Sequence, residues 1–382
     1  MDARLAHPKH VLANVQALRA IAALLVVLVH AGLPNVGIES ILGAADRPWL
    51  SPFRYIGLFG VDLFFVISGF IMLVTSWEKF GKPLAGARFL VRRIIRIYPP
   101  YWFALIPVVP VLLFAGRRFM GSHSGLQTGF LESFLLLPNP HKFVLTVGWT
   151  LVWEMIFYVV FAGLLRVNRR YVASALAVWF AVEIALYIGL KNSPNFYLNF
   201  AAAPLPMEFI FGAGVGLLYI NGVFPAPRLA AAIAGLVAAG TALAVCSGSI
   251  LLENLDIERI IMFGVPAMLL VYGGVGLEAC GVFIAPRVLQ AIGDGSYAIY
   301  LWHLSILVVV HQTLAGLHLA GPWAHAAIIA VTLALIVAFG MGVYRFFERP
   351  VTAYLNGMLA QPSRRIGEPR IVRRTVSGPA AD

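Results

Sequence analysis

Ten apolar segments, each long enough to cross a lipid bilayer as a helix, recur along the 382 residues of this chain. A transmembrane helix needs about 20 apolar residues, because the hydrocarbon core is about 30 Å thick and a helix rises about 1.5 Å per residue. Short runs that favour turns, such as "GLPN" and "NGVFPAP", separate the segments. The predicted spans are 12–33, 55–77, 97–115, 147–165, 171–190, 200–220, 229–247, 259–277, 289–314 and 323–346.

The composition excludes a soluble protein. The chain is 60% hydrophobic and only 12% charged, whereas about a quarter of the residues in a soluble domain are charged. Charged side chains as few as these could not cover the apolar core of a soluble protein of this length. Part of the apolar surface must therefore face lipid. We therefore expect an all-α polytopic membrane protein with about ten transmembrane helices. Residues 1–350 are predicted to form its transmembrane domain, and residues 351–382 a basic, disordered cytoplasmic tail.

The distribution of lysine and arginine predicts the orientation of the helices. With the N-terminus in the cytoplasm, the inner segments hold 21 of the 28 basic residues and the outer segments hold 7. This bias follows the positive-inside rule, and ten helices then place the C-terminus in the cytoplasm as well. The net charge of +11 is thus explained by topology, and no nucleic-acid partner is expected. A cleavable signal peptide at 12–33 is disfavoured, because no small-residue cleavage site follows it.

Four ionisable side chains lie inside the predicted helices at similar depths, namely those of His30, Asp62, Glu154 and His303. Arg19 and His30 share a helix face, eleven residues and about 16 Å apart, which puts His30 near mid-membrane if Arg19 reaches the cytoplasmic interface. Asp62 and Glu154 lie about 12 and 10 Å below the outer edge, and His303 also falls in the outer half. Each could be a structural partner of a neighbouring helix, but such groups are costly in a bilayer and mark functional sites.

A second cluster is the segment "RFLVRRIIRIYPPYW" at the start of the third predicted span. Arg93 and Arg96 are three residues apart and therefore share one helix face. Paired guanidinium groups suit phosphate oxygens, so these two residues are candidates for a phosphate site. The alternative is positive-inside anchoring, which we favour for Arg88 and Arg92.

A third pattern is a polar stripe of Ser296, Tyr300 and His303 on one face of the ninth predicted span. Their spacing of four and three residues brings them onto adjacent turns. The stripe either packs against another helix or takes part directly in a reaction. The two cysteines, Cys246 and Cys280, lie on different predicted helices near opposite faces, so neither a disulfide nor a thiolate metal site is expected.

Five motifs in a fixed order resemble those of the bacterial integral-membrane acyltransferase-3 family. They are Arg19-x10-His30, "GVDLFFVISGF", Arg93-x-x-Arg96, "TLVWEMIFY" and "SYAIYLWH", and the resemblance covers residues 11–350. Members of that family O-acetylate lipopolysaccharide O-antigen, Nod factors, exopolysaccharides, peptidoglycan and some antibiotics. Many carry an additional soluble esterase-like domain, an activity that we do not expect in this chain, since it continues only into a short tail.

The resemblance implies an acyltransferase of the bacterial inner membrane that uses no metal. It would move an acyl group, expected to be acetyl, from cytoplasmic acetyl-CoA to a hydroxyl of a cell-surface or exported carbohydrate or glycolipid. The implied roles are CoA-phosphate binding for Arg93 and Arg96 with Arg19 at the inner entrance, and general base for His30. Either Asp62 or Glu154 would orient His30, and His303 would contact the acceptor or the thioester.

Two other classes of function fit part of the pattern. Intramembrane His, Asp and Glu also form proton relays in secondary transporters and could serve a sugar-lipid flippase. The sequence contains no internal repeat of the kind that many transporters show, and a pair of inner arginines suits a phosphorylated substrate better than proton coupling. A non-catalytic membrane subunit of a polysaccharide assembly complex would show neither turnover nor CoA binding. The sequence does not determine the acceptor, the length of the acyl group or the oligomeric state. It also leaves open whether transfer is direct or passes through a covalent acyl-His30 intermediate.

Overall fold

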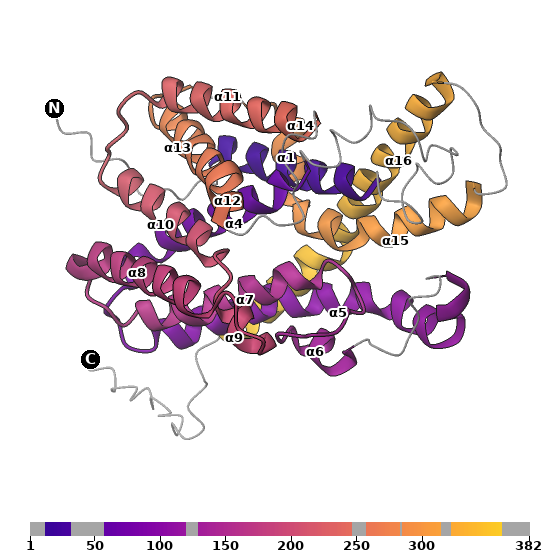
Figure 1. The fold of residues 1–382 in the computed structure, drawn as a ribbon, viewed down its shortest axis with the longest axis horizontal. Coiled ribbons are helices and arrows are strands. Elements are labelled where there is room, and N and C mark those ends of the chain that lie inside the picture. The colour runs from indigo at the N-terminus through magenta and orange to yellow at the C-terminus, as the bar shows by residue number, and fades with distance from the viewer. Residues whose placement is uncertain are drawn as a thin grey trace, which may run out of the picture.

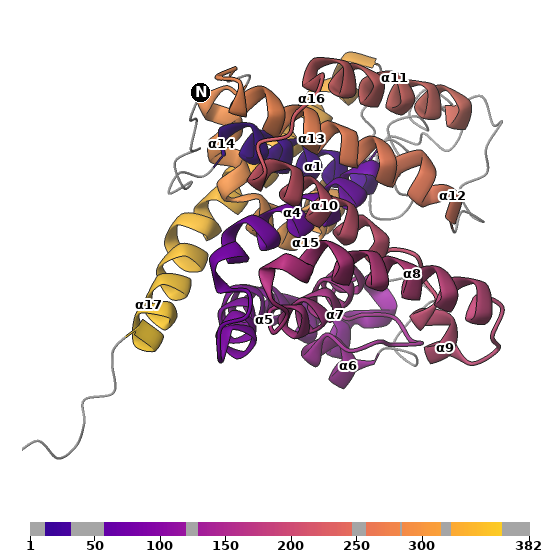
Figure 2. The ribbon, with the colours of Figure 1, turned by 90° about the vertical axis from the view of Figure 1, so that its left-hand side faces the viewer.

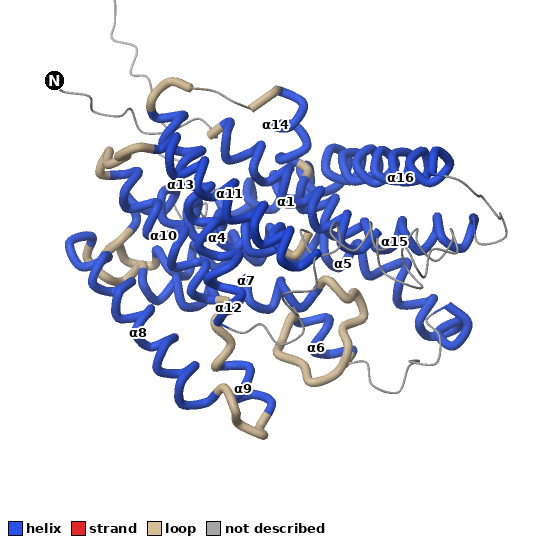
Figure 3. Tube along the Cα trace, turned by 45° about the horizontal axis from the view of Figure 1, so that its top comes forward, coloured by secondary structure: helices blue, strands red, loops and turns tan. Residues whose placement is uncertain are grey.

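The computed structural model describes residues 12–31, 57–119, 129–246, 257–282, 285–314 and 322–360. Within these ranges every regular element is a helix, and Figure 3 shows helices joined by loops with no strand among them. The described residues therefore confirm the predicted all-α fold class.

Each predicted span overlaps a helix of the structure. The helices are α1 (Ala13–Ala31), α4 (Phe59–Ser76), α5 (Ala85–Phe119), α6 (Phe130–Leu135), α7 (Gly148–Leu164), α8 (Val172–Leu190), α9 (Phe196–Ala201), α10 (Pro206–Ile220), α11 (Pro227–Cys246), α12 (Ile257–Arg259), α13 (Val265–Ala279), α14 (Arg287–Asp294), α15 (Ser296–Leu314), α16 (Pro322–Val343) and α17 (Arg349–Ala360).

Seven helical stretches among the described residues are long and apolar enough to cross a membrane, and two shorter apolar helices, Gly148–Leu164 and Pro227–Thr241, accompany them. Apolar side chains on α8 point away from the protein, with Val178 63% and Ile188 72% exposed. Such exposed apolar side chains are stable only against lipid. The chain is thus a multi-span membrane protein, whereas the number of crossings and their orientation stay predictions.

The helices form two groups with a third set between them. In Figures 1 and 2, α1, α11, α13 and α14 lie on one side, α5, α6, α7 and α8 on the other, and α4, α10 and α15 between. The backbones of α4 and α10 touch, because a Cβ at Gly69 would collide with the carbonyl oxygen of Phe209 and one at Gly212 with that of Val66. Small residues permit such close approach in membrane helices.

A carboxylate from α13 fixes the start of α1. The side chain of Glu278 accepts hydrogen bonds from the backbone N–H groups of Ala13 and Asn14, both at 2.8 Å. The first turn of a helix has unpaired N–H groups and favours negative charge, so this contact stabilises the N-terminus of α1. It also fixes the height of Arg19 and His30 relative to the neighbouring helices.

The third predicted span began too late. The structure starts α5 at Ala85, whereas the predicted span starts at residue 97, because the arginines before it lower the local hydropathy. The start of α5 lies against the end of α7, because a Cβ at Gly86 would meet the Ala162 carbonyl oxygen. Further along α5, the Tyr101 hydroxyl lies 3.2 Å from an ideal Cβ at Gly148, where α7 begins, so the two helices run side by side in opposite directions.

Arg93 and Arg96 therefore lie alongside the middle of α7 and not at the end of a helix. They are about 12 and 16 Å along the axis of α5 from Ala85, at a rise of about 1.5 Å per residue. The aromatic residues that follow them hold α6, because Tyr98, Tyr101 and Trp102 donate hydrogen bonds to the carbonyl oxygens of Leu135, Ser133 and Phe134.

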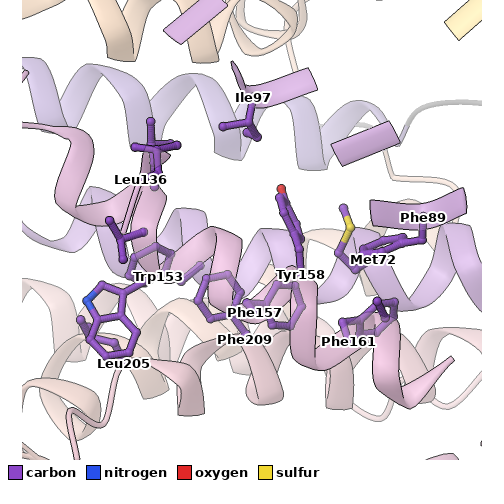
Figure 4. Close-up of a cluster of buried hydrophobic side chains, with 14 of the residues drawn as sticks. Met72, Phe89, Ile97, Leu136, Trp153, Phe157, Tyr158, Phe161, Leu205 and Phe209 are labelled. Atoms are coloured by element: carbon purple, nitrogen blue, oxygen red, sulfur yellow. The ribbon is translucent and has the colours of Figure 1, made fainter. Parts of the chain in front are cut away.

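A buried aromatic cluster fixes α7 against α5 and α10. The rings of Phe157 and Phe209 stack at 4.1 Å, and Phe89 lies 5.8 Å from Tyr158. Figure 4 shows these rings in one cluster with Trp153. Close packing of this kind leaves α7 little freedom to rotate, so the direction of its polar side chains is set.

The last helix extends into the predicted tail. A π-helical segment, Tyr344–Glu348, connects α16 to α17, and α17 runs from Arg349 to Ala360. Pro350 lacks an N–H group and cannot make the regular helical bond at this point, which accounts for the irregular segment just before it. Residues 351–360 are thus helical rather than disordered, and residues 361–382 of the predicted tail lie outside the described residues.

Candidate active site

A cavity of about 320 Å³ lies between α1, α4, α5, α7 and α15. Four of the seven predicted site residues line it, namely Arg19, Arg93, Arg96 and Glu154. Apolar side chains of α4 form much of the remaining wall. The further polar side chains in the lining are Gln16, Ser68, Thr75, Thr150, Tyr158, Ser296, Tyr297 and Tyr300.

None of the three arginines in this cavity has a carboxylate partner among the described residues. The ion pairs closer than 4.0 Å there are Arg169–Glu78 and Arg259–Asp62. The Arg93 guanidinium lies over aromatic rings, and its Nε atom is buried without a hydrogen-bond partner. Glu154 and Glu348 interact electrostatically with these arginines without a direct ion pair. Because buried positive charge is normally paired, three guanidinium groups that share one cavity without a direct ion pair among the described residues indicate a site for an anion.

The pair of arginines predicted to anchor the protein is more exposed than the pair predicted to bind phosphate. Arg88 and Arg92 on the same helix are exposed, whereas Arg93 and Arg96 are partly buried and line the cavity. The spacing of three residues therefore identified the pair that shares a face. The exposed pair provides a matched comparison, because it carries the same charge on the same helix.

Arg19 is held by residues that the sequence analysis missed. Its Nη1 atom donates a 2.9 Å hydrogen bond to Oε1 of Gln16, and Nε2 of Gln16 donates to Oδ1 of Asp294 at the end of α14. Gln16 is almost completely buried. A polar residue three positions before Arg19 was a usable signal, since it must share the arginine's face, but Asp294 could be connected to it only by the fold.

Glu154 lies in the wall of the cavity that also contains the arginines. Its Oε1 atom accepts a hydrogen bond from the hydroxyl of Tyr158, one turn later on α7. Tyr158 in turn contributes its ring to the surroundings of Arg93, 5.6 Å from the guanidinium carbon. Glu154 is therefore placed to contact a molecule in the cavity, and its hydrogen-bond partner is a tyrosine rather than His30.

The two predicted histidines touch each other across α1 and α15. Nε2 of His303 lies 3.2 Å from Nδ1 of His30, and their ring centroids are 4.8 Å apart. Each ring also bonds a backbone carbonyl oxygen of its own helix: Nδ1 of His30 lies 2.8 Å from that of Val26, and Nδ1 of His303 lies 2.6 Å from that of Tyr300. His303 is fully buried, and His30 is partly buried.

Tyr300 connects the cavity to the histidine pair. It lines the cavity, and its ring centroid lies 5.8 Å from that of His303. Its hydroxyl contacts Oγ1 of Thr150 at 2.5 Å and donates to the carbonyl oxygen of Val147 at 3.1 Å. The predicted polar stripe thus has Ser296 and Tyr300 in the cavity wall, with His303 behind them.

Asp62 is engaged in a separate buried ion pair. Its carboxylate accepts two hydrogen bonds from Arg259 of α12, at 2.9 and 3.1 Å. Both Asp62 and the neighbouring Glu208 are fully buried. Either Asp62 or Glu154 was expected to orient His30, but in the described part of the chain neither carboxylate hydrogen-bonds that histidine. The geometry therefore supports neither residue in that role.

We expect Arg259→Gln to lower the free energy of unfolding by about 3–5 kcal/mol, because it leaves buried carboxylates without a cation. The melting temperature in detergent measures this loss. Adding Asp62→Asn to the same protein removes one of these carboxylates, so the double variant should recover much of the stability.

The double variant also tests the role of Asp62. If Asp62 serves to pair with Arg259, the double variant keeps its activity once it folds. A stable double variant without activity would instead return Asp62 to the reacting groups.

Comparison with known proteins identifies the family of this chain. The model of the acyltransferase-3 family, described as an acyltransferase domain, matches residues 12–342. The exopolysaccharide production protein ExoZ of Rhizobium meliloti is 32% identical over 327 residues, which cover 80% of this chain and 96% of that protein. No solved structure matches the chain significantly.

Two further relatives have names that state an activity. The peptidoglycan O-acetyltransferase OatA of Listeria monocytogenes is 25% identical over 77% of this chain and 51% of its own length, so this chain spans about half of that protein. The acyltransferase MdmB of Streptomyces mycarofaciens is 25% identical over 90% of this chain and 92% of its own length. With a family match that extends over nearly all of the described helices, this chain belongs to the acyltransferase-3 family and is a membrane acyltransferase.

Proposed function

We propose that this acyltransferase moves an acetyl group from cytoplasmic acetyl-CoA to a hydroxyl of a cell-surface or exported carbohydrate, across the bacterial inner membrane. The observation that carries the proposal is the cavity lined by three arginines without a direct ion pair among the described residues, whose wall residue Tyr300 packs against a histidine pair. The names of two relatives, an exopolysaccharide production protein and a peptidoglycan O-acetyltransferase, support a carbohydrate acceptor.

The donor end of the cavity is formed by Arg19, Arg93 and Arg96. Their side chains fit the phosphate groups of CoA, because guanidinium groups donate paired hydrogen bonds to phosphate oxygens. The buried, unpartnered Nε of Arg93 is a donor that a bound anion would satisfy. In the predicted orientation, the N-terminal end of α1 and the C-terminal end of α4 face the cytoplasm, and both contribute to this part of the cavity.

The acceptor side of the site lies next to the cavity, around His30, which His303 and Tyr300 connect to the cavity wall. Its Nδ1 donates to the Val26 carbonyl oxygen, so in the neutral ring Nε2 holds a lone pair. That nitrogen takes the proton of the acceptor hydroxyl while the hydroxyl oxygen attacks the thioester carbonyl carbon. The carbon–sulfur bond then breaks, and the departing thiolate receives a proton. A covalent acyl-His30 route would use the same nitrogen as nucleophile.

Purified protein in detergent tests the proposal directly. We expect it to bind acetyl-CoA in calorimetry and to transfer a radiolabelled acetyl group to oligosaccharides of the producing bacterium's surface glycan. The transporter alternative predicts the opposite result, with sugar-lipid or proton movement in proteoliposomes and no acetyl transfer or hydrolysis. Absence of both binding and turnover would favour a non-catalytic subunit.

A further inference from the structure

We propose that His303 is a positioning residue that fixes the ring of His30 so that Nε2, and not Nδ1, faces the acceptor hydroxyl. This inference rests on the proposed function, since it assigns a partner to the base of that reaction. It replaces the two carboxylates that were considered for this role, because Asp62 pairs with Arg259 and Glu154 with Tyr158.

The hydrogen bonds determine which nitrogens carry protons. A backbone carbonyl oxygen only accepts, so each Nδ1 that bonds a carbonyl must donate. Nδ1 of His303 therefore donates to Tyr300, which leaves Nε2 of His303 as an acceptor in the neutral ring. Nδ1 of His30 donates to Val26 and, at 3.2 Å, to that acceptor. One tautomer of each neutral ring thus satisfies all three contacts.

A cationic His303 does not fit the same contacts. Its Nε2 would then donate to Nδ1 of His30, and Nδ1 could no longer donate to the Val26 carbonyl oxygen 2.8 Å away. His303 is also fully buried, where an unpaired charge is unfavourable. The geometry therefore favours a neutral pair before the reaction.

The contact should strengthen during acyl transfer. When Nε2 of His30 takes the hydroxyl proton, the ring becomes an imidazolium, and Nδ1–H becomes a charged donor. The Val26 carbonyl and Nε2 of His303 are already aimed at it, so no reorganisation is needed at that moment. His303 is fully buried, whereas His30 is partly exposed, so His303 acts through His30 and does not touch the acceptor.

Packing of α1 against α15 keeps the two rings in register. Ala23 and Val27 on α1 belong to one buried cluster with Ile299, Ile306 and Leu307 on α15. On α15 these residues lie on both sides of His303, and on α1 they occupy the two turns before His30. The His30–His303 contact is therefore fixed by the helix interface, as expected of a preorganised pair.

Two amide substitutions separate the acceptor at Nε2 from the rest of the ring. In His303→Gln, the amide reaches the position of Nε2 and can accept from His30. In His303→Asn, the shorter amide reaches only the position of Nδ1, so it keeps the bond to the Tyr300 carbonyl and removes the acceptor. Both variants keep the charge and polarity of the site.

We expect kcat to fall about tenfold or more in His303→Asn, the equivalent of one charge-assisted hydrogen bond, and within about threefold of wild type in His303→Gln. KM for acetyl-CoA should be unchanged in both, because the arginines that bind the donor lie elsewhere in the cavity. Equal kcat values in the two variants, whether high or low, would overturn the inference, since a purely structural role makes no difference between the two amides.

A second measurement does not depend on activity or on the folding of the His303 variants. Nitrogen-15 NMR of histidine-labelled wild-type protein, with His30 assigned by difference from His30→Gln, reports which ring nitrogen carries the proton. We expect the Nδ1–H tautomer of neutral His30, and the Nε2–H tautomer would overturn the inference. Failure of the proposed function is recognised separately, by a wild-type protein that transfers no acetyl group or by an active His30→Gln variant.

Discussion

His30→Gln should lower the rate of acetyl transfer by about 10²–10⁴-fold, the usual size of a lost general base. Glutamine keeps a polar group of similar size on α1 that can still form hydrogen bonds, but it has no basic nitrogen near neutral pH. Because His30 does not line the donor cavity, acetyl-CoA binding should be unchanged. Single-turnover transfer and calorimetric binding, measured on the same preparation, separate the two effects.

A matched control is His141→Gln, because His141 is exposed and lies outside the cavity. That variant should transfer acetyl groups at the wild-type rate. A His30→Gln protein that keeps more than about a third of wild-type turnover would remove His30 from the reaction, given the expected size of the loss. An acetyl group trapped on His30 in the absence of acceptor would instead favour the covalent route, which the same substitution also blocks.

Features that depend on neighbouring residues could be predicted from the sequence. The apolar segments gave helices because each needs only its own length and composition. The shared face of Arg93 and Arg96 followed from a spacing of three residues, and both side chains line one cavity. The predicted span starts at residue 97, directly after Arg96, because a hydropathy argument treats charged residues as outside a span. In the structure α5 starts at Ala85, and a cavity inside the protein accommodates the two arginines.

Contacts between distant segments could not be predicted from one sequence. His30 and His303 are 273 residues apart, and Asp62 and Arg259 are 197 apart. Similar predicted depth in the membrane grouped His30 with His303, and the two rings are in contact in the structure, but depth gives no rotation about the helix axis. Asp62 has a comparable predicted depth and points instead toward α12. Only the packing of α4, α13, α14 and α15 around α1 separates these partners.

The double substitution Arg93→Ala and Arg96→Ala should weaken acetyl-CoA binding by about 10²-fold or more. A hydrogen bond to a charged group contributes about 1.5–3 kcal/mol, and two such contacts are removed, although neighbouring contacts to one ligand are not strictly additive. Turnover at saturating donor should be affected less than affinity, because His30 is unchanged. Binding of S-acetylpantetheine, which has no nucleotide phosphates, should be the same for variant and wild type.

The exposed pair on the same helix gives the control for this prediction. Arg88→Ala combined with Arg92→Ala removes the same charge from α5 but no side chain from the cavity. This variant should bind acetyl-CoA with an affinity close to wild type, with a small loss at most from long-range attraction that salt screens. If both double variants lose affinity equally, the effect is one of general charge, and the cavity is not the donor site. If neither does, Arg93 and Arg96 anchor the helix, and the main argument against a transporter is lost.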